Sequence, residues 1–453
     1  MTPKRLVRKP FVWSREILKS YFARRIVYPS ELPSIMRKHI YTGAMGSIWA
    51  SLISGILFIY FGNTIGLSVF QWGLLGGISS WVIATQLLSA RLTERTGRRK
   101  VVWFIFAIVD RSLRFIGILA SFILWKIGHP YAGIVLITSI VLSNLFGTMS
   151  NAPWMSWFAD IVPKDEHGRF WGRRTAWIAL STITVTLAAG WFVDWIPEQY
   201  KVHSMLVIFS IATLFGIIDI LIHGTIPEPR MVMPVKKHFL IHVLEPIRDN
   251  RFRPWLVFNF WWTLSMSLGG ALAGIYWVGE LELKRNFLGG IMVTTGLTLL
   301  GNMMTSTWSG KLVDRAGAKK VLFWGHLFWT TLPIYWFLAT PETALFWIGV
   351  SSVVGGISTT AAINAANKII TRLPPQGNRA MYIAVSASLG SIAAGFGVMG
   401  AGLILRLLDN WSLTIMNRSF GAFHFLFFVS TCTRLLCTLL FIRRIGELDN
   451  NFP

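Results

Sequence analysis

The feature that most constrains this chain is a series of apolar runs, each about as long as a membrane-spanning helix. An α-helix rises 1.5 Å per residue, so about 20 apolar residues cross the ~30 Å hydrocarbon core of a bilayer. Twelve such runs occur, at residues 40–62, 69–90, 101–125, 131–158, 175–196, 203–224, 254–278, 287–309, 321–338, 343–368, 380–405 and 422–442. With 53% hydrophobic and only 14% charged residues, the composition is that of a membrane protein. We therefore predict an all-α integral membrane protein with twelve spans.

The spans form two sets of six around a polar segment. This predicts a basic cytoplasmic tail at 1–38, a six-helix bundle at 39–224, a linker with an amphipathic segment at 225–253, a second six-helix bundle at 254–442 and a cytoplasmic tail at 443–453. Cytoplasmic loops retain Lys and Arg. The N-terminal tail, the loops after the even-numbered spans and the C-terminal end hold 34 of the 43 basic residues, and the opposite loops hold six. Both termini are therefore expected in the cytoplasm, and the protein in the cytoplasmic (inner) membrane.

A short basic turn follows the second span and recurs after the eighth. Residues 90–100 read ARLTERTGRRK and residues 310–320 read GKLVDRAGAKK. At one offset of 220 residues (314 minus 94), the copies pair Glu94 with Asp314, Arg95 with Arg315 and Gly97 with Gly317. Glycine permits the left-handed backbone of a tight turn, and we expect Arg95, Arg98, Arg99 and Lys100 to lie at lipid phosphates. The chain is therefore predicted to consist of two related halves.

Twelve spans in two halves, both ends inside, and a G-x-L-x-D-R-x-G-R-R-like turn after the second span of each half resemble the major facilitator superfamily of secondary transporters. The resemblance covers essentially the whole chain, although Ala90 replaces the first motif glycine that Gly310 keeps. It implies alternating access, with the acidic residues of the turns facing the starts of the eleventh and fifth spans in a latch. The gating latch would comprise Glu94, Arg95, Gly97, Arg98, Gly310, Asp314, Arg315 and Gly317. The alternative is a turn whose charges only enforce topology.

The resemblance also implies that the first, fourth, seventh and tenth spans line a central cavity. The candidates in those spans are Ser51, Asn144, Asn151, Asn259, Trp262, Thr360, Asn364, Asn367 and Lys368. Amides and hydroxyls hydrogen-bond hydroxyl groups, and aromatic ring faces stack on C–H surfaces, so this set favours a small polar, saccharide-like solute. For each residue the alternative is a hydrogen bond between helices.

Ionisable side chains inside membrane spans are costly, and they are usually paired or functional. This chain carries Asp110, Arg111 and Arg114 in the third span, Asp219 in the sixth and Arg434 in the twelfth. Two interpretations stay open, namely proton coupling through an aspartate and a structural ion-pair network. Because the resemblance makes the third and sixth spans outer helices, the expected cavity contains no carboxylate. The coupling ion, a proton or sodium, is left open.

Several classes of function are disfavoured by what the sequence lacks. It has no Walker lysine or phosphate loop and no His/Cys metal spacing, so no catalytic residue, cofactor or metal is expected and the chain is not predicted to be an enzyme. The charge of +23 is spread in short bursts between spans, which argues against nucleic acid. The fourth span has no basic residue, which argues against multidrug efflux. Efflux, or a non-transporting assembly factor or sensor on this fold, remains an alternative, and a monomer is expected.

Overall fold

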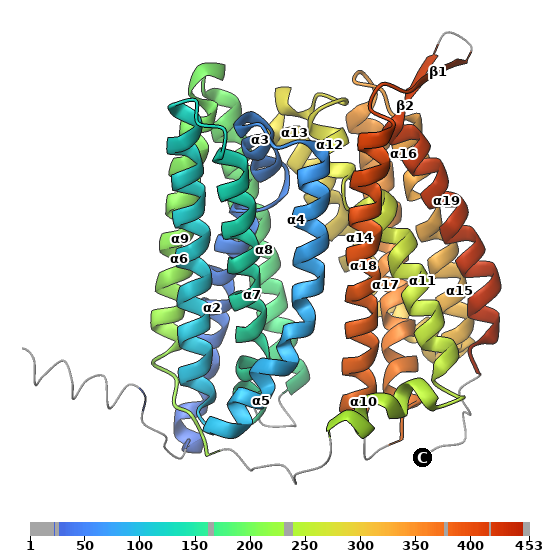
Figure 1. Ribbon diagram of the computed structural model, residues 1–453. Helices are drawn as coiled ribbons and strands as arrows, with labels where there is room; N and C mark the ends of the chain where they lie inside the picture. Colours follow the sequence, from blue (N-terminus) through green and yellow to red (C-terminus); the bar gives the residue numbers. More distant parts are fainter. Residues whose placement is uncertain are drawn as a thin grey trace, which may run out of the picture.

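The computed structural model of the chain is a bundle of long helices (Figure 1). It describes residues 22, 27–161, 167–230, 239–375, 379–415 and 418–446. In these ranges ten helices are long and apolar enough to cross a membrane. The expected second span is a shorter apolar helix over Val69–Thr85, and the third is long but carries Asp110, Arg111 and Arg114 near its middle. Most of the two predicted tails lies outside the described residues.

The N-terminal half contains eight α-helices that make up its six spans. They are α2 (Leu32–Leu52) and α3 (Gly55–Ile65), α4 (Val69–Val82) and α5 (Gln86–Thr96), α6 (Arg99–Lys126), α7 (Ala132–Ala159), α8 (His167–Trp195) and α9 (Lys201–His223). Short 3-10 turns at Pro29–Glu31, Ile83–Thr85 and Glu198–Tyr200 precede or join them. Within this half α6 packs along α7, and α2 packs against both α8 and α9.

The C-terminal half repeats this pattern after the linker helix α10 (Phe239–Arg248). Its helices are α11 (Arg253–Gly270) and α12 (Ala273–Val278), α13 (Phe287–Ile291) and α14 (Leu297–Ala316) joined by a π-turn at Met292–Gly296, α15 (Ala318–Thr330) and α16 (Leu332–Leu338), α17 (Ala344–Arg372), α18 (Arg379–Leu407) and α19 (Ala422–Phe441). One antiparallel hairpin, β1 (Ser412–Ile415) and β2 (Arg418–Gly421), precedes α19, with Leu413 opposite Phe420. The hairpin was not predicted, and it is the one described departure from an all-helical chain.

Several spans are broken rather than continuous, and the local sequence explains two of the breaks. Between α2 and α3 the chain turns at Gly55, whose φ of +68° favours glycine. Between α15 and α16 the break precedes Pro333, which has no N–H to donate to the carbonyl of Trp329 four residues earlier. Broken membrane helices leave backbone carbonyls that other groups must satisfy.

The two halves meet along two equivalent pairs of helices. The second span contacts the eleventh through α4 and α18, and the fifth contacts the eighth through α8 and α13. The first contact depends on glycine, because a Cβ added to Gly73 would lie 2.8 Å from the Cα of Gly402. At the second contact, a Cβ on Gly190 would lie 3.2 Å from the Cα of Leu288. The pairing of span two with eleven and span eight with five is the symmetry expected of duplicated halves.

Contacts between the halves are concentrated at the end of the bundle that carries α3, α12 and α13 (Figure 1). There Asp194 at the end of α8 accepts hydrogen bonds from the backbone N–H groups of Phe287 and Leu288, both at 2.8 Å. These groups begin α13, where a carboxylate is also favoured by the helix dipole. Tyr60 of α3 packs edge-on against the same Phe287 at 5.3 Å between ring centres. At the opposite end α5 packs on α6 and α7 of its own half, so the structure is closed at the α3 end.

Candidate functional site

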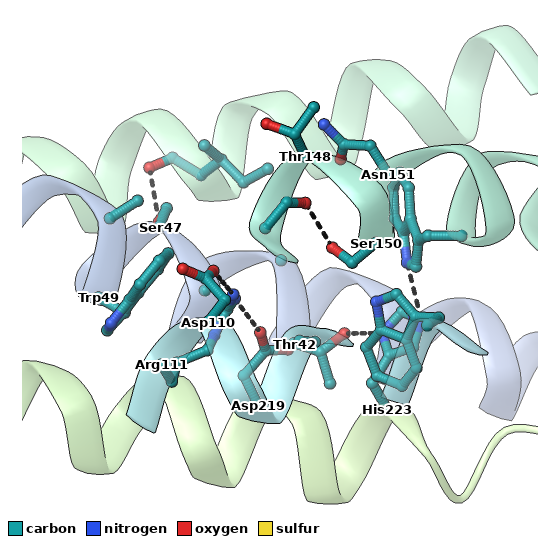
Figure 2. A pocket seen from close by; sticks show the side chains of 18 of the residues that line it. Thr42, Ser47, Trp49, Asp110, Arg111, Thr148, Ser150, Asn151, Asp219 and His223 are labelled. Carbon is teal, nitrogen blue, oxygen red and sulfur yellow. Dashed lines mark hydrogen bonds and ion pairs between the residues drawn. The ribbon is translucent and has the colours of Figure 1, made fainter. Parts of the chain in front are cut away.

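A polar cavity of about 500 Å³ lies inside the N-terminal half. It is enclosed by α2, α6, α7, α8 and α9, and its wall carries two carboxylates, three guanidinium groups, one imidazole and three indole rings. Figure 2 shows several of these side chains converging from separate helices. The resemblance places the third and sixth spans outside a central cavity lined by the first, fourth, seventh and tenth spans, whereas this cavity lies inside one half and both spans line it. Asp110 of α6 and Asp219 of α9 both line it.

Two glycines explain why the buried carboxylates fit here. A Cβ added to Gly147 of α7 would lie 2.9 Å from a carboxylate oxygen of Asp110. A Cβ on Gly46 of α2 would lie 2.9 Å from a carboxylate oxygen of Asp219. Real Cβ atoms essentially never approach a non-bonded atom that closely. These glycines therefore give the two carboxylates the room to lie between helices, a role that sequence analysis did not assign to them.

The two aspartates share one arginine. Arg111 donates to Asp110 from Nη1 at 2.8 Å, and its Nη2 lies 3.7 Å from Asp219 on the facing helix. The guanidinium carbon of Arg111 lies 3.9 Å from the ring centre of Trp49, a cation–π contact. Asp110 is only 3% exposed and Asp219 only 8%. This arrangement ties α2, α6 and α9 together and supports the predicted ion-pair network.

Arg114 extends the same network toward α7 and α4. Arg114 lies four residues after Asp110 on α6, and the two side chains lie 4.0 Å apart. The hydrogen bonds of Arg114 go instead to the Ser143 hydroxyl at 2.9 Å and to the amide oxygen of Asn144. Asn144 in turn donates to Ser79 of α4 at 2.8 Å. The network thus reaches α4, which contacts the other half of the protein.

The hydrogen bonds of His223 determine its tautomer. The indole N–H of Trp154 donates to Nε2 of His223 at 2.9 Å, and an indole nitrogen only donates. Nε2 therefore carries no proton, Nδ1 carries the proton, and Nδ1 donates to the Thr42 hydroxyl at 2.9 Å. Thr42 and His223 are joined by a dashed line in Figure 2. His223 is neutral in this arrangement and does not pair with Asp219, although the two share a face of α9.

Arg174 is a cavity residue that sequence analysis did not single out. Its guanidinium lies between two indoles, 5.1 Å from the ring centre of Trp154 and 5.4 Å from that of Trp171. A Cβ on Gly43 would lie 2.9 Å from its Nε, so that glycine makes room for it. Nε is buried without a hydrogen-bond partner. Among the described residues Arg174 makes no ion pair.

The predicted cavity residues of the two halves differ in their surroundings. In the N-terminal half Asn144 and Asn151 line the cavity, together with Ser47 and Thr148. Ser51 hydrogen-bonds the carbonyl of Ile48 within its own helix at 3.2 Å.

In the C-terminal half the predicted residues make contacts between helices. The Asn259 amide donates to the Ser386 carbonyl at 3.0 Å, Thr360 to Asn302 at 2.9 Å and Asn364 to the Ser309 hydroxyl at 2.7 Å. Trp262 is 5% exposed among aromatic rings, with His326 at 4.3 Å between ring centres. Asn367 is exposed. For Asn259, Thr360 and Asn364 the contacts match the alternative of a hydrogen bond between helices.

The repeated turns have the expected backbone but different side-chain contacts. Gly97 ends α5 with φ +59°, and Gly317 separates α14 from α15 with φ +89°. Asp314 is paired with Lys368 of α17 at 2.8 Å, inside its own half. The side chain of Glu94 lies outside the described residues. Arg95, Arg98 and Arg315 are exposed, as Asp314 is, and Gly310 has open space around it.

The expectation that Arg99 and Lys100 lie at lipid phosphates is wrong. They are 1% and 2% exposed. Arg99 pairs with Asp160 at the end of α7 and donates to the carbonyl of Pro229 at 2.9 Å. Its backbone N–H donates to Glu228 at 2.7 Å. The residues that follow α9 fold back over this turn, so Arg99 and Lys100 are covered by protein.

Arg434 hydrogen-bonds backbone carbonyls of two broken helices instead of pairing with a carboxylate. It is 1% exposed, and it donates to the carbonyls of Met266 at 3.0 Å and Trp329 at 3.4 Å. Met266 lies four residues before Gly270, which ends α11, and Trp329 lies in the last turn of α15. The Trp329 carbonyl lacks its usual N–H donor four residues later, because residue 333 is proline. A cation at helix C-termini is also favoured by the helix dipole.

Two similar helical halves, one of which encloses a polar cavity, define a polytopic membrane protein of the transporter class. Residues 40–292, more than half of the chain, match the family model described as Major Facilitator Superfamily. The chain therefore belongs to this superfamily, and it is a secondary transporter. A search of curated protein sequences found no match.

Solved structures with this fold carry different solutes. The xylose transporter XylE from E. coli in its inward open conformation is 14% identical, with a TM-score of 0.65 over 93% of this chain and 98% of that one. The nucleoside transporter NupG is 10% identical, with a TM-score of 0.63 over 92% and 99%. A bacterial metal transporter is 16% identical, with a TM-score of 0.62 over 93% and 100%. At these identities the likeness establishes the fold and leaves the substrate undetermined.

Proposed function

We propose that this transporter moves a small polar organic solute, saccharide-like in its hydroxyl groups, by rocker-switch alternating access. The observation that carries the proposal is the 500 Å³ polar cavity, a volume in the usual ~300–1,000 Å³ range for small-molecule sites. Asn151 and Thr148 present an amide and a hydroxyl to this cavity from one face of α7 (Figure 2). Such groups recognise hydroxyl-bearing solutes. A xylose transporter and a nucleoside transporter share the fold.

The distribution of contacts between the halves supports alternating access. The halves are held together at the α3 end by Asp194 and by packing of Tyr60 on Phe287. The end that carries α5 and α10 would then be the open one. Since the basic residues concentrate in loops at that end, we infer that it faces the cytoplasm, with both termini there, and that the membrane is the cytoplasmic (inner) membrane.

The repeated turns would form the gating latch when the α5 end closes. In the described state Asp314 is held by Lys368, so closing would require the carboxylate to exchange this partner for the start of α8. Replacing Asp314 with Ala is expected to increase labelling of cysteines placed at the α5 end, with Asp409→Ala at an exposed position as the control. Unchanged labelling would leave the turn as a topology signal only.

Coupling to a proton or a sodium ion would make the protein a symporter. Asp110 and Asp219 are the carboxylates that could take part, and they now line the cavity. Asp219 is the better candidate, because its contact with Arg111 at 3.7 Å is longer than that of Asp110 at 2.8 Å. If Asp219→Asn and Asp110→Asn proteins both still concentrate solute, neither residue carries the coupling ion.

Uptake into proteoliposomes tests the function directly. The purified chain, expected to be a monomer, would be reconstituted and offered sugars, nucleosides, peptides and drugs, with and without proton and sodium gradients. Flux of a hydroxylated solute that depends on a gradient supports the proposal. Flux of drugs alone would favour efflux. Absence of any flux, combined with a stable protein partner, would favour an assembly factor or sensor.

A further inference from the structure

The charges that line the cavity do not balance. Two aspartates face three arginines, and His223 is neutral because its Nε2 accepts the Trp154 indole N–H. The wall therefore carries one net positive charge. Asp110 and Asp219 are both occupied by Arg111. An ion in a desolvated site without a counterion is costly.

The unbalanced charge can be assigned to Arg174. Arg111 is paired with the aspartates, and Arg114 donates to Ser143 and Asn144 next to Asp110. Arg174 has no hydrogen bond and no ion pair within 4.0 Å in the described part of the chain, and its Nε is buried. Asp219 acts on it electrostatically without contacting it, and the ion pair of Asp219 is with Arg111. The indoles of Trp154 and Trp171 cover the guanidinium while its N–H groups stay unused. A guanidinium offers five N–H donors in a planar fork that matches a carboxylate or a phosphate.

Neutral groups without partners lie close to this arginine. Trp154, which contacts Arg174, lies on α7 three residues after Asn151 and six after Thr148. Residues three apart on a helix are neighbours. The side chains of Asn151 and Thr148 make no hydrogen bond in the described structure, whereas Ser150 beside them bonds the Gly147 carbonyl at 2.7 Å. One wall of the cavity thus combines an unpaired cation, a free amide and a free hydroxyl.

We propose that the solute carries one anionic group, a carboxylate or a phosphate monoester, on a hydroxylated body. Arg174 binds the anionic group, and Asn151 and Thr148 bind hydroxyls. The inference rests on the proposed transport function, and it narrows the solute from a neutral saccharide to an organic anion such as a sugar acid or a sugar phosphate. The solute then supplies the counterion that the cavity lacks.

Matched probes test this on the wild-type full-length protein in detergent micelles. D-gluconate represents the carboxylate, glucose 6-phosphate the phosphate monoester, D-glucose the neutral body, and acetate and inorganic phosphate the bare anions. Equilibrium binding is measured for each. We expect gluconate or glucose 6-phosphate to bind at least about 30-fold more tightly than glucose and than the bare anions, as a desolvated charge pair requires. The stronger of the two identifies the anionic group.

Variants then assign the charge to one residue. Arg174→Gln is expected to lower the affinity for the preferred anionic probe to the level of glucose, and Arg174→Lys to give an intermediate value. Arg173→Gln, which removes an exposed arginine one residue away on α8, is the matched control and should bind as the wild type does. Elution as a single species on size exclusion shows that each variant is folded.

Three results would overturn the inference, namely binding of neither anionic probe, glucose binding as tightly as the anions, or full affinity in a folded Arg174→Gln protein. Bare anions that bind as tightly as the hydroxylated ones would overturn the role of Asn151 and Thr148. These failures are distinct from failure of the transport function. A protein that takes up neutral solutes in proteoliposomes keeps that function, whereas one that moves no solute loses it whatever it binds.

Discussion

The network around Arg111 gives the sharpest prediction for stability. Replacing Arg111 with Met keeps a side chain of similar length and removes the charge between Asp110 and Asp219. The side chains of Asp110 and Asp219 are only 4% and 12% exposed. Breaking a buried ion pair by removing one partner typically costs about 3–5 kcal/mol, and the cation–π contact with Trp49 adds about 0.5–2 kcal/mol. Asp110 keeps its hydrogen bond from Ser143, so we expect a loss near the lower end, about 3 kcal/mol.

The assay is equilibrium unfolding in mixed micelles, followed by tryptophan fluorescence. Arg173→Met removes an exposed arginine from α8 and should change the free energy of unfolding by less than about 0.5 kcal/mol. In the double variant Asp110→Asn with Arg111→Met, the loss should be smaller than the sum of the single losses by at least about 1 kcal/mol, because the two residues contact each other. Single losses that add within about 0.5 kcal/mol would refute the reasoning, since the pair would then contribute no coupling.

Three further predictions concern other parts of the molecule. Asp194→Ala removes two hydrogen bonds between the halves, each worth about 1.5–3 kcal/mol to a charged acceptor. Cysteines placed at the α3 end should therefore be labelled faster than in the wild type. Equal labelling rates in the variant and the wild type would show that this contact does not hold the halves together. Gly147→Ala should lower the free energy of unfolding by about 1–3 kcal/mol, because the added methyl group crowds the buried network. Gly172→Ala is the control, since Gly172 has open space around it, and it should leave the free energy of unfolding unchanged or raise it slightly. Equal effects of the two substitutions would show that the cavity has room to adjust. Arg434→Lys should cost about 1–3 kcal/mol because an ammonium group cannot reproduce the fork that reaches two helix ends, and an unchanged free energy of unfolding would argue against its role at the breaks.

Sequence analysis was most successful where a pattern is local or repeated. Twelve apolar runs predicted the spans because burial of every backbone polar group in lipid leaves the helix as the available structure. The repeated turn predicted the duplicated halves and the superfamily, and the model match to residues 40–292 shows that membership. Gly97 and Gly317 have the positive φ expected at the turns. The hairpin before α19 was missed, since its strands are only four residues long.

The site was less predictable because it depends on which helix faces approach each other. Arg174 and the glycines at 43, 46 and 147 belong to different helices, and no spacing in the sequence relates them. The spacing of Asp110 and Arg114 on one helix was informative, but the stronger pairs of Arg111 run within α6 to Asp110 and across to Asp219 of α9. The lateral packing of α2, α6 and α9 decides those partners.

The sequence by itself determined an all-helical membrane protein with about ten to twelve long apolar helices, the repeated basic turns and the presence of charges within the spans, because these follow from hydropathy and short-range backbone geometry. Only the tertiary structure decided that the third and sixth spans line a cavity, that Arg99 and Lys100 are covered, and that Arg434 serves two broken helices. Hydrogen bonds and ion pairs depend on distances of a few ångströms between segments far apart in the chain. Those distances are set by the close packing that the glycines permit.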